Sequence, residues 1–356
     1  MSVHADRRSR LAATLQERDL AGAFVTNLLN VRYLTGFTGS NGALWLGADG
    51  SGVFFTDGRY KDQVAVEAPD LEPEITRDII GRAAARMQSG RWAVETHTLS
   101  VDTYAVLAKA APETSLLSLK RRVEEMREVK DETEIDAIRR ACDISTRALH
   151  GLISGPLVGR SEREITRDLE GRMFALGAEA IAFDTILASG PNSAIPHHVP
   201  TDRVIEAGDL LKIDFGARVD GYHADCTRTF AIGKPADWQR EIHTAVREAQ
   251  AAGLDRLRAG ETVADSWEAA TRVLDAAGWL ESFTTGLGHG VGLQIHEDPF
   301  IGACDTGRIH SRSAVTMEPG IYLPGRGGVR IEDTVVVTSG APEVLTTMTK
   351  DLLELA

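Results

Sequence analysis

Five side chains of the kinds that bind divalent metal ions are distributed through the second half of this chain. Each lies in a short stretch typical of a strand or of a glycine- and proline-rich turn, and they are Asp214, Asp225, His289, Glu318 and Glu332. Four carboxylates and one imidazole suit two hard-to-borderline divalent ions, whose charges the carboxylates balance. A dinuclear site of this kind activates water for hydrolysis. This set constrains the fold and function more than any other feature of the chain.

Two of these candidate ligands lie in one predicted β-hairpin, within residues 213–230. Asp220-Gly221 is a strong signal for a two-residue turn, and with it as the loop Asp225 lies opposite Gly216. Asp214 is then a diagonal neighbour of Asp225 on the same face, at a Cα separation of about 7–8 Å. Carboxylates at that spacing can each hold one ion of a pair about 3.5–4 Å apart. The alternative is that both face solvent, although aspartate is depleted in strands.

The remaining two carboxylates lie in later strand segments. Glu332 is surrounded by β-branched residues, where a buried carboxylate is costly unless it is paired or coordinated, and Asp333 points to the opposite face. Glu318 precedes Pro319, which restricts its backbone to an extended conformation. Taken alone, each glutamate is equally compatible with a structural role and with a ligand role.

Histidines occur in two glycine- or proline-rich segments. The glycines of 285–297 match neither GxGxxG nor a P-loop, and HExxH is absent, so they are better suited to a close approach of the backbone to a ligand or metal. His289 and His296, seven residues apart, can reach one site. His197 and His198 lie in a polar loop between prolines, which favours function, although an isolated histidine more often has a structural role.

With 356 residues the chain exceeds a single core, and two domains are expected. We place the boundary near residue 122, where a charged segment, 121–134, looks like a linker that enters a helix. The first domain alternates helical and strand patterns. Its expected elements are a helix at 3–18, a strand at 21–26, strands within 33–60 with hairpin turns at Ser40-Asn41-Gly42 and Ala48-Asp49-Gly50, and a strand at 91–95.

The second domain is expected to combine helices with a strand-rich half. Ser161 and Glu164 form a capping-box signature at the start of a helix that Gly177 ends. Further helices are expected at 237–258 and 262–278, and strands from 209 to 231 and from 314 to 338.

Composition excludes several classes of partner. The net charge of −13 argues against nucleic acid and against anionic membranes, and no apolar run of about 18 residues occurs. The N-terminus predicts an amphipathic helix and not a signal peptide. Three widely spaced cysteines, Cys142, Cys226 and Cys304, predict reduced thiols and a cytoplasmic location. Cys226 adjoins Asp225 but points to the other face of the strand, so we expect a packed thiol.

Together these segments resemble the pita-bread metallopeptidase family, which contains methionine aminopeptidase, aminopeptidase P and prolidase. The motifs follow the family's order, and they are IDFG (213–216), TRTF (227–230), GHGVGL (288–293), MEPGIY (317–322) and RIEDT (330–334). LNVRYLTGFTGSNG (29–42) and FTDGRY (55–60) resemble the creatinase-type N-terminal domain of the Xaa-Pro branch. The resemblance implies an α/β creatinase-like domain, 1–121, and an α+β pita-bread domain with a curved antiparallel sheet, 122–356.

The resemblance also assigns roles within the site. It implies two divalent ions, Mn²⁺ first and Co²⁺ or Zn²⁺ as alternatives, held by the five residues named at the start. His197 matches the first histidine of the family's PH loop, with His198 less favoured; His296 matches the second active-site histidine, and Arg330 an arginine beside the last ligand. Thr285 departs from some aminopeptidase P sequences, which have a histidine there.

The implied activity is hydrolysis of the bond between an N-terminal residue and proline, by an Xaa-Pro aminopeptidase on small peptides with proline second. Glu318 would carry the proton from the attacking water to the leaving nitrogen, and His197 and His296 would hydrogen-bond the scissile carbonyl. Arg330 would orient a ligand carboxylate or bind a product carboxylate. A prolidase specific for dipeptides is the nearest alternative, and a creatinase-like amidinohydrolase and a non-catalytic binding protein are remote ones. Family members are commonly homodimers, which we expect here.

Overall fold

The computed structural model describes residues 2–87 and 89–356, and the chain divides into two units, Met1–Arg127 and Glu128–Ala356. The boundary expected near residue 122 lies at the start of α6 (Arg122–Glu128), close to this division. None of the helices among the described residues is long and apolar enough to cross a membrane. Each unit has its own sheets and its own core, and the two are described in turn.

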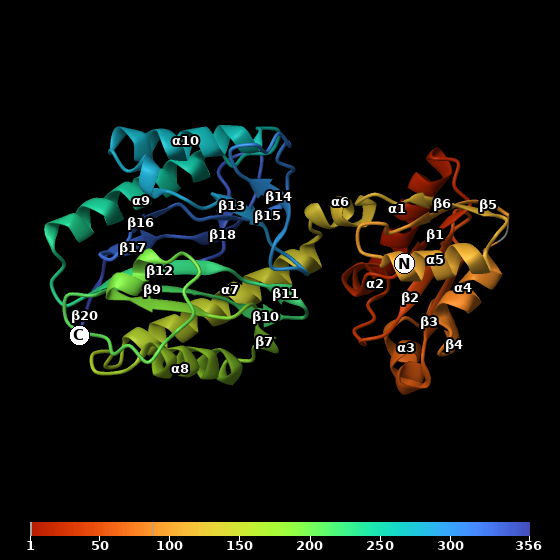
Figure 1. The fold of residues 1–356 in the computed structure, drawn as a ribbon, viewed down its shortest axis with the longest axis horizontal. Helices are drawn as coiled ribbons and strands as arrows, with labels where there is room; N and C mark the ends of the chain where they lie inside the picture. Colours follow the sequence, from red (N-terminus) through yellow and green to blue (C-terminus); the bar gives the residue numbers. More distant parts are fainter. Residues whose placement is uncertain (1, 88) are drawn as a thin grey trace. The chain divides into compact units, whose positions relative to one another are not determined.

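The N-terminal unit is built on one mixed sheet, with strand order β4-β3-β2-β1-β5-β6 (Figure 1). At its centre, β1 pairs antiparallel with β2 and parallel with β5, and β1 is fully buried. The elements before α6 are α1 (Val3–Glu17), β1 (Gly22–Val25), α2 (Leu28–Thr35), β2 (Ala43–Gly47), β3 (Gly52–Thr56), η1 (Gly58–Tyr60), α3 (Lys61–Glu67), β4 (Glu72–Ile75), α4 (Ile79–Arg86), β5 (Gly90–Val94), α5 (Val101–Ala110) and β6 (Thr114–Ser118).

Local signals in this unit predict some elements correctly and others wrongly. The N-terminal helix and the hairpin turn at Ala48-Asp49-Gly50, between β2 and β3, are confirmed. The hairpin at Ser40-Asn41-Gly42 is wrong, because the element directly before that turn is a helix, α2, which Asn27 caps, and not a strand. The expected linker 121–134 is also wrong. Most of it is helical, since α6 is followed by a capping box at Asp131 that starts the next helix.

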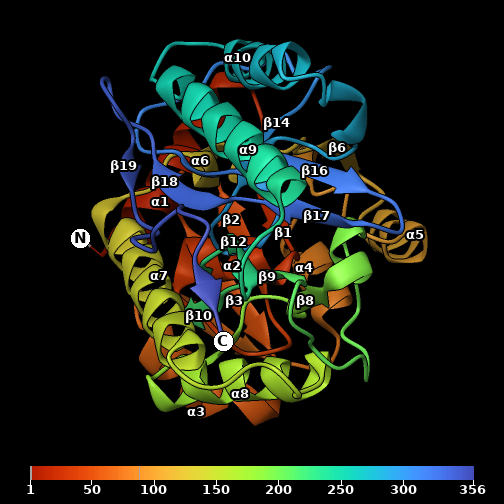
Figure 2. The same cartoon turned by 90° about the vertical axis from the view of Figure 1, so that its left-hand side faces the viewer.

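The C-terminal unit places small sheets between two pairs of helices (Figures 1 and 2). Its helices are α7 (Glu132–Ile153), α8 (Glu162–Ala175), η2 (Gly190–Ala194), α9 (Asp237–Arg256), α10 (Val263–Ala276) and η3 (Leu280–Ser282). Its strands are β7 (Ala180–Ile181), β8 (Ile186–Ser189), β9 (Leu210–Phe215), β10 (Ala217–Val219), β11 (Tyr222–His223), β12 (Cys226–Ile232), β13 (Gly288–Gly290), β14 (Glu297–Ile301), β15 (Ala314–Met317), β16 (Gly320–Leu323), β17 (Gly327–Arg330), β18 (Asp333–Val336), β19 (Glu343–Val344) and β20 (Glu354–Leu355).

Two hydrophobic cores cover the two sides of these strands. Helices α7 and α8 pack with β9 and β12 through residues such as Leu169, Ile213 and Phe230. Helices α9 and α10 pack with β15, β17 and β18 through residues such as Val246 and Val335. The helices expected at 161–177, 237–258 and 262–278 are confirmed, and α8 begins with the predicted capping box. The strands are thereby fixed between two apolar layers.

The register predicted for the hairpin that carries the two aspartates is confirmed. The turn residues Asp220 and Gly221 both have positive φ, as a two-residue hairpin loop requires. Beyond the turn, β9 and β12 pair with Asp214 opposite Thr227, which is the same register as that predicted from the turn. A Cβ atom on Gly216 would lie 1.8 Å from the Ala224 carbonyl oxygen, so the hairpin needs glycine at this crossing.

A buried ion-pair network lies behind the strand that follows Glu332. Asp333 is fully buried and accepts hydrogen bonds from Arg228 Nη2 at 2.7 Å and from Gln250 Nε2 at 2.9 Å. Lys350 Nζ lies 2.5 Å from the same carboxylate. Arg228 also donates to the main-chain carbonyl of Glu332 at 2.5 Å. This network fixes the backbone of β18 and the side on which Glu332 projects.

We predict that Asp333→Ala destabilises the metal-free protein by about 3–5 kcal/mol, because it leaves buried Arg228 without its counter-charge. The free energy of unfolding is measured by urea denaturation. The matched control is Asp351→Ala, which removes an exposed pair with Arg247 and should cost about 0–1 kcal/mol. Equal losses in the two variants would show that the buried network does not hold β18.

Candidate metal centre

The five candidate ligands come from separate elements and line one cavity of about 410 Å³. Asp214 lies near the end of β9 and Asp225 just before β12, so one hairpin supplies both. His289 is the middle residue of β13, Glu318 follows β15, and Glu332 lies between β17 and β18. The structure therefore brings together all five residues singled out from the sequence.

The donor atoms lie close enough to share metal ions. One donor atom each from Asp225, His289 and Glu332 lie within 4.8 Å of one another. His289 Nε2 is 3.4 Å from Asp225 Oδ2 and 3.5 Å from Glu318 Oε1. His289 Nδ1 lies 2.9 Å from the Gly290 carbonyl oxygen, which can only accept, so Nδ1 carries the proton. That tautomer leaves the Nε2 lone pair directed at the carboxylates, as metal ligation requires.

The positive charge near these carboxylates is too small to balance their negative charge. Burial raises the pKa of Asp225 and Glu332 well above the usual range, and the neighbouring carboxylates raise it further. Burial also raises the pKa of Glu318, against the opposing effect of His289 and Arg330. Oδ1 of Asp214 is buried without a hydrogen-bond partner. An oxygen-rich donor set with unmatched negative charge and an unused buried oxygen fits two divalent cations.

Arg330 lies behind the carboxylates and is 1% exposed. Its guanidinium donates to Asp214 Oδ2, to Thr227 Oγ1 at 3.1 Å and to the Tyr322 hydroxyl at 2.9 Å. Thr227 Oγ1 in turn donates to Glu332 Oε2 at 2.6 Å. Arg330 is not among the described residues that line the cavity. Its contacts therefore orient two of the candidate ligands from the buried side.

Four histidines line the cavity, and one of them, His198, bonds to Glu162 and not to the candidate metal ligands. The rings of His289 and His296 lie 4.4 Å apart, edge to face at 78°. Partial burial lowers the pKa of His296, and the nearby His289 and His197 lower it further, so the neutral form of His296 is favoured at pH 7. His198 borders the cavity, but its Nε2 lies 2.8 Å from Glu162 Oε2. Of the two adjacent histidines, His198 thus bonds to Glu162, whereas His197 lines the cavity.

Sequence analysis missed Lys212, two residues before Asp214. Its side chain is fully buried, and Nζ donates to the carbonyl oxygens of Ile195 at 2.7 Å and Pro196 at 3.3 Å. Burial lowers the pKa of Lys212 to about 6, and the charge of Arg330 acts in the same direction. A lone lysine within the apolar strand LLKIDF was the signal that could have identified it. The strand that supplies Asp214 thus also holds the loop that supplies His197.

Two further features of the site are an apolar cavity wall and the thiol of Cys226 beside Asp225. Phe183, Ile186, Val199 and Pro200 form an apolar wall next to the carboxylates. Cys226 is buried, and its Sγ donates to the Phe215 carbonyl oxygen at 3.4 Å. Burial raises the pKa of this thiol well above its usual value. The expected packed thiol of Cys226 is confirmed.

Comparisons with known proteins give matches over nearly the whole chain. The model of metallopeptidase family M24 matches residues 136–339, and the creatinase/prolidase N-terminal domain model matches residues 7–129. An Xaa-Pro dipeptidase from Pyrococcus furiosus is 33% identical over 98% of this chain and 99% of its own length.

Solved structures give similar matches. An Xaa-Pro dipeptidase from Bacillus anthracis superposes with a TM-score of 0.94 at 34% identity, covering 99% of this chain and all of that one. An X-Pro aminopeptidase from Thermotoga maritima superposes with a TM-score of 0.91, also at 34% identity, covering 98% of this chain and 99% of that one.

We predict that Mn²⁺ binding to the metal-free protein releases protons, and that it releases more of them as the pH falls from 8 towards 6. The raised pKa values of Asp225, Glu318 and Glu332 keep these carboxyls partly protonated, and a metal requires the ionised form. Calorimetric titration in two buffers of different protonation enthalpy measures the number released. Identical heats in both buffers would contradict the prediction.

The same shifts determine how stability depends on pH without metal. A carboxyl whose pKa is higher in the folded than in the unfolded protein stabilises the fold at low pH, and this contribution is lost as the pH rises through the folded value. The melting temperature of the metal-free protein should therefore fall as the pH rises above the ordinary carboxyl range, and added Mn²⁺ should reduce that fall.

Proposed function

This chain belongs to metallopeptidase family M24, with a creatinase/prolidase N-terminal domain, and on that premise we propose that it hydrolyses the bond between the first residue of a short peptide and a proline in second position. The family resemblance and the two-part fold expected from the sequence are confirmed, and the chain is a metallopeptidase. The remote alternatives of an amidinohydrolase and a non-catalytic binding protein therefore fall away. The substrate and the roles of single residues are the proposal.

The observation that carries the proposal is the convergence of four carboxylates and His289 on one cavity that also contains His197 and His296. Asp214, Asp225, His289, Glu318 and Glu332 would hold two divalent ions. When bound, these ions would activate water and polarise the scissile carbonyl. The oxygen-rich donor set with a single imidazole favours Mn²⁺, with Co²⁺ or Zn²⁺ as alternatives.

The side chains around the ions would move protons and stabilise charge. Glu318, 18% exposed and bordering the cavity, is suited to take a proton from water and give it to the proline nitrogen. That nitrogen belongs to a tertiary amide and must be protonated to leave, so an acid is required. His197 and His296 are exposed at the cavity and would donate hydrogen bonds to the carbonyl oxygen as it becomes tetrahedral. Arg330 would orient Asp214, because it is buried behind it.

Two kinds of enzyme cleave this bond, a dipeptidase and an aminopeptidase. The relatives called Xaa-Pro dipeptidase, from Pyrococcus furiosus and Bacillus anthracis, support a dipeptidase. The X-Pro aminopeptidase structure from Thermotoga maritima supports an aminopeptidase at the same identity. Thr285 stands in place of the histidine of some aminopeptidase P sequences, which leaves the choice open, but two of these three relatives are dipeptidases. We therefore propose the dipeptidase first and the aminopeptidase second, in a cytoplasmic homodimer.

The substrate is tested with an Xaa-Pro dipeptide and an Xaa-Pro-Xaa tripeptide, with metal-free protein supplied with Mn²⁺, Co²⁺, Zn²⁺ or no metal. We expect metal-dependent cleavage of the dipeptide that Glu332→Ala abolishes, because that variant lacks a proposed ligand. Release of the first residue from the tripeptide as well would establish the aminopeptidase. No cleavage of either peptide with metal bound would refute the proposed function.

Glu318→Gln is expected to lower kcat by about 10²–10⁴-fold, because an amide cannot accept and return the proton. Steady-state kinetics are read together with the metal content per chain, since Glu318 is also a proposed ligand. The control is Glu343→Gln, which removes an exposed carboxylate paired with Arg139 and should keep kcat within twofold. A fully metal-loaded Glu318→Gln with normal kcat would exclude the proton-transfer role.

A further inference from the structure

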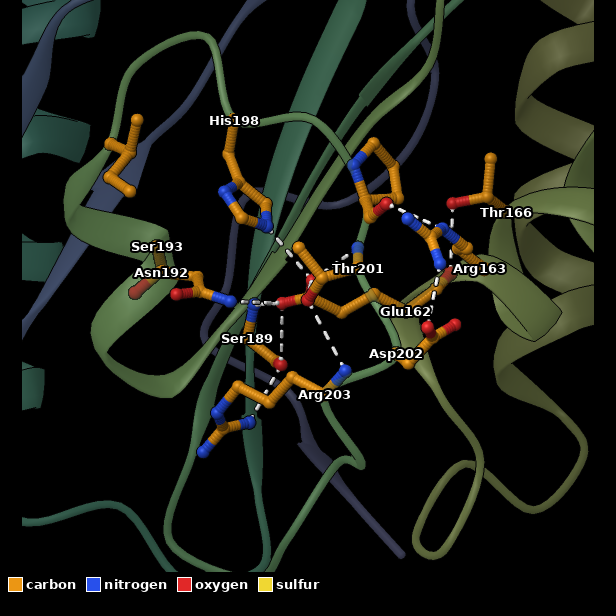
Figure 3. Close-up of polar contacts among 12 residues, drawn as sticks. Glu162, Arg163, Thr166, Ser189, Asn192, Ser193, His198, Thr201, Asp202 and Arg203 are labelled. Carbon is orange, nitrogen blue, oxygen red and sulfur yellow. Dashed lines mark hydrogen bonds and ion pairs between the residues drawn. The ribbon is translucent and has the colours of Figure 1, made fainter.

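The buried carboxylate of Glu162 lies outside the metal centre, at the first position of α8 (Figure 3). Its side chain is 0% exposed. Oε1 accepts hydrogen bonds from the amide and the hydroxyl of Ser189, both at 2.8 Å, and from Asn192 Nδ2 at 3.0 Å. Oε2 accepts from His198 Nε2 at 2.8 Å, and from the amide and the hydroxyl of Thr201 at 2.9 and 2.7 Å. One carboxylate thus organises four residues.

Ser189 lies directly before a loop, residues 190–201, and the other three residues belong to that loop. Ser189 ends β8 where the loop begins, and Thr201 lies where it returns, so the Glu162 carboxylate joins the two ends of the loop (Figure 3). Arg203 reinforces this base, since its Nη1 donates to the Ser189 hydroxyl at 2.7 Å. The loop carries His197, which lines the cavity.

The contacts to Glu162 are charge-assisted. Burial alone would raise the pKa of this carboxyl, but the hydrogen bonds from Thr201, His198 and Asn192 outweigh burial and lower the pKa to about 2. The group is therefore ionised at neutral pH and can only accept, which means that His198 Nε2 carries a proton. Hydrogen bonds to an ionised acceptor are about twice as strong as neutral ones.

Hydrophobic packing does little to hold the loop. Ile195 is 48% exposed and Val199 is 76% exposed, so two of its apolar side chains are not buried. Polar contacts fix it instead, on both sides of His197. Before His197, Lys212 Nζ donates to the carbonyl oxygens of Ile195 and Pro196. Glu162 binds the next residue, His198. The position of His197 thus depends on an anchor before it and an anchor after it.

We propose that Glu162 is a positioning residue, which sets His197 at the cavity by holding His198 and Thr201. The two adjacent histidines then have separate tasks: His198 anchors the loop, and His197 meets the substrate. This inference rests on the proposed function of His197, which donates to the scissile carbonyl. Its structural part, the control of the loop by Glu162, does not depend on the substrate.

Glu162→Gln tests the proposal with a side chain of the same shape. The amide nitrogen has no acceptor lone pair, so either the Ser189 amide or the Thr201 amide loses the acceptor that the carboxylate provided. We expect kcat and kcat/KM to fall together by about 10–100-fold, with KM and metal content unchanged, because the lost interaction is made in the transition state. The control is Asp168→Asn on the same helix, whose carboxylate pairs with Arg160 and Arg172, and which should stay within twofold.

A double-mutant cycle separates positioning from general destabilisation. In a His197→Ala background, Glu162→Gln should change kcat by less than twofold, because its effect passes through the residue already removed. Multiplication of the two losses would overturn the proposal. Thr201→Ser, which keeps the hydroxyl donor, should retain activity, whereas Thr201→Val should lose part of it. This pair tests the same anchor if Glu162→Gln fails to fold.

Amide hydrogen exchange provides a readout without substrate. The amides of Ser189 and Thr201 donate to different oxygens of Glu162, so Glu162→Gln should reduce the protection of one of these amides from exchange, while Asp168→Asn leaves both unchanged. Loss of protection with no hydrolysis of any Xaa-Pro peptide by the wild type would refute the proposed function but support the loop anchor. Unchanged protection in Glu162→Gln would overturn the anchor itself.

Discussion

Concentrated negative charge is the constraint on which the C-terminal unit depends. Asp214, Asp225, Glu318 and Glu332 border one cavity, three of them less than 10% exposed. Two like charges about 4 Å apart repel by about 4 kcal/mol at the effective dielectric constant near a protein surface. Arg330 and Thr227 offset part of this cost through direct contacts, and protonation offsets more when no metal is bound. Bound metal ions would therefore stabilise this fold as well as supply its chemistry.

Several groups at the cavity are held by a second group behind them. Arg330 orients Asp214, Arg228 holds the Glu332 backbone, and the Gly290 carbonyl fixes the tautomer of His289. The same arrangement extends to the loop of His197, which Lys212 and Glu162 hold from either side. These supporting groups are themselves buried and charged or polar. Buried polar contacts of this kind define a single geometry, because each lost bond leaves a desolvated partner.

The parts of the site that could be predicted from the sequence were those set by local geometry. Asp220-Gly221 predicts the hairpin register because turn length and the two-residue period of strands leave one solution. Convergence of His289 and Glu332 on that hairpin is a tertiary property, and only the motif resemblance indicated it. The turn signal at Ser40-Asn41-Gly42 failed because a local signal does not reveal a helix before it. Glu162 was missed because an acidic first-turn residue is common in any helix.

The choice between dipeptide and longer substrates depends on the chemical group attached after the proline, and not on the metal chemistry. A dipeptide presents a carboxylate there, whereas a tripeptide continues with a neutral amide. Among the described residues that line the cavity none is lysine or arginine, and the neutral form of His296 is favoured at pH 7 because partial burial and nearby histidines lower its pKa. None of these described lining residues therefore supplies a fixed positive side-chain charge for that carboxylate. A preference for dipeptides would have to come from shape, through walls that leave no room for a third residue.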